Sequence, residues 1–176
     1  TGKAGFLETV ETALQLGDTI AAKSGIRVAV YYVTDSSVSN YREDFTNPVI
    51  NSSDSRDISR TFPEGLIREK ISKMEGVLSQ RQTPLFILHD DYRSDRLNEA
   101  YQGGLLELAV NSGGTAVFCR SRAEIQPAAA KLWAQITSLF TATVQLPDKV
   151  RRNCDLKLDG GDTALTHRAR FTIKEK

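Results

Sequence analysis

One apolar run that ends in a polar turn constrains the fold of this chain more than any other feature. Residues 26–33 are almost all apolar, β-branched or aromatic, which is typical of a strand buried on both faces of a parallel sheet. Asp35, Ser37 and Ser39 follow at alternate positions, just beyond the end of that predicted strand. Ligands and ions bind at this end of the strands in doubly wound α/β sheets, so the run ties the fold to a candidate site.

Helical and strand patterns alternate through the next part of the chain. Apolar residues at helical spacing predict four helices, which start near Phe6, at Pro63, near Leu97 and after Ser121. The last of these helices carries Trp133, which we expect to be a core residue. Short apolar runs predict two more buried strands, so we expect adjacent parallel strands at 26–33, 84–88 and 115–119.

From Thr141 the apolar period changes from 3.6 to 2 residues. This pattern predicts strands at 141–146, 154–158 and 165–173, the last two forming a hairpin across 159–162. We therefore expect one α/β domain over residues 1–176, a parallel sheet flanked by helices, with a β tail over 141–176.

Composition excludes some classes of partner. A chain of 176 residues with 40% in the hydrophobic class can bury one proper core. A net charge of +1 gives no electrostatic reason to expect nucleic acid as a partner. No apolar run approaches the roughly 20 residues that span a bilayer. We favour an extracytoplasmic location, secreted or periplasmic; the start at Thr1, without an initiator Met, fits a processed or truncated end.

The two cysteines, Cys119 and Cys154, lack the spacing of a zinc site. They are either two buried thiols, the interpretation we favour, or one disulfide. A disulfide requires their Cα atoms to lie within about 7 Å of each other.

Three segments resemble a known family. Residues 104–118, read as a helix ending in Asn111-Ser112-Gly113-Gly114 and leading into a strand, resemble the C-terminal portion of a von Willebrand factor A domain. Residues 40–54 and the tail motif at 168–171, Arg-Ala-Arg-Phe, are similar to the divergent bacterial branch of that family described from acidobacteria. The resemblance implies a Rossmann-like α/β fold, incomplete at its N-terminus.

The resemblance also implies a metal-ion-dependent adhesion site. In one register Asp35, Ser37 and Ser39 are its DxSxS ligands, hard oxygens suited to Mg²⁺ or Mn²⁺. In the other register, 26–33 is the family's fourth strand and Asp35 stands for a later Asp. We favour this second register because residues 2–10 also resemble the family's entry to the helix before its fourth strand, and because too few strands follow Val33 for 26–33 to be the first. Position 4 is then Ala where the family has a metal-binding Thr, and DxSxS lies upstream of this chain. We expect no working metal site from this chain alone and no other cofactor.

Two classes of function stay open. The first is a non-enzymatic protein-interaction or adhesion module that contacts a protein partner through its strand-end loops. The second is a small hydrolase-like α/β enzyme that uses His89, Asp90 and Asp91, which follow the predicted strand 84–88. We favour the first class, and we interpret His89–Asp91 as a solvated acidic loop. The oligomeric state is left open.

Overall fold

The computed structural model describes most of the chain. The described residues are 6–35, 63–94, 96–140, 142–146, 153–162, 165, 167–168 and 170–172. The elements run in the order α1 (Phe6–Ser24), β1 (Val30–Thr34), α5 (Pro63–Leu78), β2 (Leu85–His89), α6 (Arg96–Asn111), β3 (Ala116–Phe118), α7 (Arg122–Thr137), β4 (Asn153–Asp155) and β5 (Arg170–Thr172).

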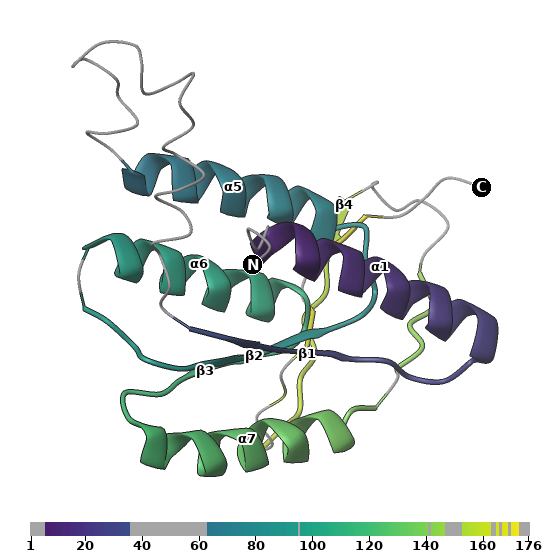
Figure 1. Ribbon diagram of the computed structural model, residues 1–176. Helices are drawn as coiled ribbons and strands as arrows, with labels where there is room; N and C mark the ends of the chain where they lie inside the picture. The colour runs from purple at the N-terminus through teal and green to yellow at the C-terminus, as the bar shows by residue number, and fades with distance from the viewer. Residues whose placement is uncertain are drawn as a thin grey trace.

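The first three strands form a parallel sheet in the order β1-β2-β3 (Figure 1). Val30 pairs with Leu85 and Thr34 with His89, while Ile87 pairs with Ala116 on the other side of β2. The predicted set of adjacent parallel strands is confirmed, and with it the α/β class. Parallel strands need helical crossovers, which the chain supplies between β2 and β3 as α6.

Helices cover both faces of the sheet, as Figure 1 shows: α1, α5 and α6 lie on one face and α7 on the other. On the first face, Leu85 and Ile87 pack with Leu14, Leu78 and Leu105. On the second face, the alternate residues of β2 pack against α7, with Phe86 and Leu88 contacting the cluster of Ala128 and Leu132. Every residue of β2 is buried.

The prediction for the first strand was wrong in two respects. The strand is Val30–Thr34 rather than 26–33, and it is not buried on both faces. Tyr31 is 37% exposed and Val33 is 59% exposed. The cause is non-local: β1 is at the edge of the sheet, and α7 packs against β2 rather than under β1.

Trp133 was also predicted wrongly. The α7 side chains that pack on the sheet include Ala128 and Leu132, whereas Trp133, one position further, is 64% exposed. At 100° per residue, a neighbour of a core position can fall outside the buried stripe when the helix covers a narrow sheet.

The C-terminal segment is less regular than predicted. Residues 142–146 are exposed and form no strand, although alternation predicted one there. Strands β4 and β5 pair antiparallel over three residues each, with Cys154 opposite Phe171. Gly161 has a φ of +60° and donates its N–H to Asp159 Oδ1, which is turn geometry. The predicted strands 154–158 and 165–173 were therefore too long, because the described residues 156–158, 165, 167 and 168 belong to no strand.

Both cysteines are free thiols, so the disulfide alternative is wrong; the prediction of two buried thiols holds for Cys119 but not for Cys154, which is only half-buried. Cys119 is fully buried beyond the end of β3, and burial raises the pKa of its thiol. Among the helices of the described residues, none combines the length and the apolar character that crossing a membrane requires.

The motif Gly113-Gly114 has a structural cause. Gly113 has a φ of +89°, in the left-handed region that glycine tolerates, and it ends the turn after α6. A Cβ at Gly114 would overlap the backbone carbonyl of Leu85, so glycine allows the turn to approach the start of β2. In the same turn, Ser112 Oγ accepts the Leu85 N–H at 2.9 Å.

We predict opposite effects for two glycine-to-alanine substitutions. Gly114→Ala should lower the free energy of unfolding by about 2–4 kcal/mol, because backbone cannot move aside as a flexible side chain can. Gly76→Ala, in α5 with no atom within 4 Å of the added Cβ, should raise it by about 0.5–1 kcal/mol. Urea unfolding of both variants measures the difference, and equal effects would contradict the packing at Gly114.

Candidate functional site

The carboxyl ends of β1 and β2 lie side by side. Thr34 pairs with His89, and the Asp90 N–H donates to the Thr34 carbonyl at 2.8 Å. Asp35 therefore begins the loop beside the loop of His89, Asp90 and Asp91, as expected for neighbouring parallel strands. Asp35 is exposed; Ser37, Ser39 and Ala4 lie outside the described residues.

His89 is the last residue of β2 rather than part of a solvated loop, and its side chain is fully buried. Its ring lies 5.3 Å from the Phe118 ring and 6.3 Å from the Tyr101 ring, centroid to centroid. Within the described residues, neither ring nitrogen has a hydrogen-bond partner. This residue alternates with Ile87 and so points toward the α6 side of the sheet.

The electrostatics keep His89 neutral. Burial lowers the pKa of His89 below its ordinary value of 6.5, and the carboxylates of Asp35, Asp90 and Asp91 oppose this shift without cancelling it. Tyr32 stands on the same face of the sheet, and burial raises its pKa to about 12. The side chains of His89 and Tyr32 are therefore neutral, whereas the carboxylates of Asp35, Asp90 and Asp91 lie just beyond them, where the strands end.

The loop after β2 is held by bonds to β3 and α6. The Tyr92 N–H donates to the Cys119 carbonyl at 2.8 Å, and the Cys119 N–H donates to the His89 carbonyl at 2.8 Å. On the α6 side, Gln102 bonds the backbone of Arg93 twice, accepting its N–H at 3.0 Å and donating to its carbonyl at 2.7 Å. These bonds fix the backbone of the loop. We call Asp90, Asp91 and Arg93, together with the neighbouring Arg120, the strand-end platform.

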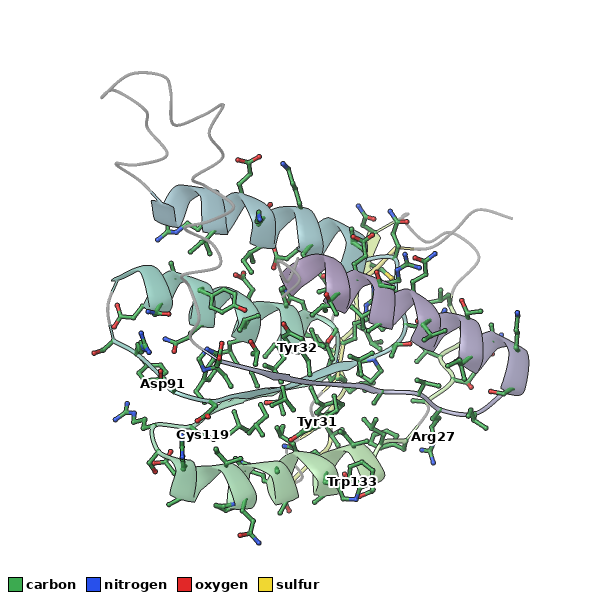
Figure 2. The ribbon with its side chains drawn as sticks, viewed as in Figure 1. Arg27, Tyr31, Tyr32, Asp91, Cys119 and Trp133 are labelled. Atoms are coloured by element: carbon green, nitrogen blue, oxygen red, sulfur yellow. The ribbon has the colours of Figure 1, made fainter. Side chains whose placement is uncertain are left out.

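The exposed surface of this platform carries both signs of charge. Arg93 binds Asp91 Oδ2 through Nε at 2.9 Å and Nη2 at 2.6 Å, and Asp91 has a left-handed φ of 60°. Arg120 lies over the Tyr92 ring at 5.2 Å. Figure 2 shows Asp91 at the strand-end side of the molecule, with Cys119 nearby.

Sequence reasoning missed the two arginines of this platform. Arg120 could have been found by the rule that found Asp35, because it follows Cys119 just past the end of the third strand. Arg93 gives no such signal, since its place depends on the paired bonds to Gln102, which is far along α6.

The described residues do not assemble a metal centre. They contain no group of three or more His, Cys, Asp or Glu side chains placed to hold a metal ion. Of the predicted ligands, Asp35 alone is described, and the buried ring of His89 points into the α6 layer.

A cavity of about 680 Å³ lies at the opposite end of the sheet. Its walls come from the segments that enter the strands, from the end of α7 and from the C-terminal tail, and include Arg27, Thr83, Gly114, Gln135, Leu158 and Arg168. The hydrolase hypothesis needs a pocket beside His89, so this cavity does not serve it. His167 also lines the cavity, and the Leu158 N–H donates to its Nε2 at 3.4 Å.

Searches against protein-family models, curated proteins and solved structures find no match for this chain.

The buried neutral state of His89 predicts a pH dependence of stability. Because its folded pKa is lowered, the unfolded chain binds more protons below about pH 6.5, so folding stability falls as pH drops through that value. In His89→Leu this loss should be smaller between about pH 7.5 and about pH 5.5. At the higher pH the variant should be at least as stable as wild type, since it buries no unsatisfied nitrogen. Urea unfolding at both values tests this, and identical losses in both proteins would contradict it.

Proposed function

We propose that this chain is a non-enzymatic protein-interaction module, related to the C-terminal portion of von Willebrand factor A domains, that binds a protein partner through its strand-end loops. The observation that carries the proposal is the fixed platform of Asp90, Asp91, Arg93 and Arg120 beside Asp35. The side chains of Asp91, Arg93 and Arg120 are exposed, that of Asp90 is half-buried, the backbone is held by hydrogen bonds, and the surface displays both charges. Such surfaces suit charge-complementary protein contacts, in which rim charges steer association.

The burial of His89 argues against the hydrolase alternative. A general base must come within hydrogen-bond reach of its substrate, and the His89 ring lies under Phe118 and Tyr101 with no exposed surface. Asp91 forms an ion pair with Arg93, and a carboxylate occupied in this way suits recognition better than proton transfer.

The metal site is proposed to be degenerate. In the register that we favour, Asp35 is one ligand of a set whose Thr position is Ala4 and whose DxSxS ligands lie upstream. One carboxylate and water do not hold Mg²⁺ tightly, because that ion dehydrates reluctantly.

Calorimetric titration with Mg²⁺ and Mn²⁺ tests the metal part of the proposal. We expect no binding tighter than about 1 mM for the wild-type chain, as for a single carboxylate ligand. Glu107→Gln, an exposed carboxylate on α6 away from the strand ends, serves as the control for non-specific cation binding. Micromolar affinity that Asp35→Ala abolishes and Glu107→Gln keeps would overturn the favoured register.

Site-specific photo-crosslinking tests the interaction part. A benzophenone amino acid at Ser94, exposed in the loop after β2, should give a discrete adduct with another protein in the cells that make this chain. The same probe at Ser24, exposed at the end of α1 and at the opposite end of the sheet, is the matched control. Equal adducts from both positions, or none from Ser94, would contradict binding through the strand-end loops.

A further inference from the structure

The outer edge of β1 has no strand partner among the described residues. In the order β1-β2-β3, one side of β1 bonds to β2: the Val30 N–H donates to the Pro84 carbonyl, and the Thr34 carbonyl accepts the Asp90 N–H. Backbone groups along a strand alternate between its two sides. The N–H and C=O groups of Tyr31 and Val33 therefore point away from β2.

Apolar side chains line both sides of this edge. On the α7 side, Tyr31 and Val33 are exposed on β1, and Trp133 is exposed on α7. Figure 2 shows Tyr31 and Trp133 on this side of the sheet. On the other side, Leu16 and Ile20 are exposed one turn apart on α1. They lie on the side of α1 opposite Asp18, which accepts the Thr83 N–H before β2.

This edge lacks the usual protection against pairing. Natural edge strands carry Lys, Pro or a bulge that blocks another strand. The residues of β1 are Val-Tyr-Tyr-Val-Thr, which favour strand pairing and carry no charge. The edge is therefore a surface for strand addition.

We propose that β1 of a second copy of this chain covers the edge, antiparallel, with Tyr31 opposite its own counterpart on the two-fold axis. A two-fold interface brings the same surface of each copy together, so an edge must complement itself. In this register Ala29 lies opposite Val33. The backbone N–H and C=O groups of Tyr31 and Val33 that point away from β2 then form hydrogen bonds with the second copy. The two Tyr31 rings form a cross-strand aromatic pair on the α7 side.

Charge fixes the register. With Tyr31 on the axis, Arg27 of each copy lies opposite Asp35 of the other, and both side chains are exposed. A shift that puts Tyr32 on the axis would place Asp35 opposite Ala29 and lose both charge pairs. The Arg27 guanidinium donates to the Leu139 carbonyl and has five N–H donors, so it can also bind a carboxylate.

The dimer uses the side of a strand, so it does not depend on the strand-end platform. It does compete with the upstream strand that the von Willebrand factor A resemblance implies at the same edge. Failure of the crosslinking test at Ser94 would leave it standing, and a monomeric chain would leave the platform intact.

Sedimentation equilibrium of the 176-residue chain tests the dimer. We expect twice the chain mass of 19.4 kDa at micromolar concentrations. Tyr31→Lys should raise the dissociation constant about tenfold, because two like charges would replace the aromatic pair on the axis. Leu106→Lys, which changes an exposed apolar residue of α6, is the matched control and should remain dimeric. Circular dichroism confirms that each variant is folded.

A charge exchange tests the register. Arg27→Asp and Asp35→Arg should each weaken the dimer about tenfold, and the double variant should recover most of that loss. Arg27→Asp also removes the bond to Leu139, which recovery in the double variant controls for. A wild-type chain that stays monomeric at about 100 µM would overturn the proposal. So would a dimer that Tyr31→Lys leaves intact, or a double variant no tighter than the single ones.

Discussion

Burial of β2 on both faces is the constraint on which the described structure depends. Leu85 and Ile87 join the cluster formed with α1, α5 and α6, while Phe86 and Leu88 join the cluster on α7. Burying each such side chain contributes about 1.5–3 kcal/mol relative to leaving it in water. Two separate apolar layers thus share one strand, and the four residues Leu85–Leu88 that serve them are all apolar.

The consequence appears where β2 ends. His89 continues the alternation of Leu85 and Ile87 into the layer that α6 covers, so its ring is buried although the next residues are acidic and solvated. The same continuity places the backbone of Asp90 and Tyr92, which bond to Thr34 and Cys119. The backbone that carries the charged side chains of Asp90 and Asp91 is therefore anchored to buried structure.

How much of this the sequence could predict depends on how local each cause is. The apolar run 84–88 and the glycines after α6 act through their immediate neighbours, and the parallel strand set followed from them. The exposure of Tyr31 and Trp133 depends on where α7 lies under the sheet, which no residue of β1 or α7 encodes by itself. Alternation at 142–146 had the period of a strand, but that segment forms none in the structure. Asp35 was found because strand ends share an edge, whereas Arg93 depends on Gln102 in another element.

The open side of β1 connects the resemblance with the dimer. A strand supplied from upstream, as the von Willebrand factor A resemblance implies, and a second copy of β1 would use the same outward groups of Tyr31 and Val33. Each backbone N–H or C=O group can pair with one neighbouring strand at a time, so the upstream strand and the second copy cannot both occupy this edge. They also differ in direction, because a two-fold pair of β1 strands is antiparallel while the sheet is parallel. Exchanging the charges of Arg27 and Asp35 affects only the antiparallel dimer. An upstream strand that pairs parallel with β1 would bring no second Asp35 opposite Arg27. The charge exchange therefore distinguishes an edge that binds its own copy from one that binds another strand.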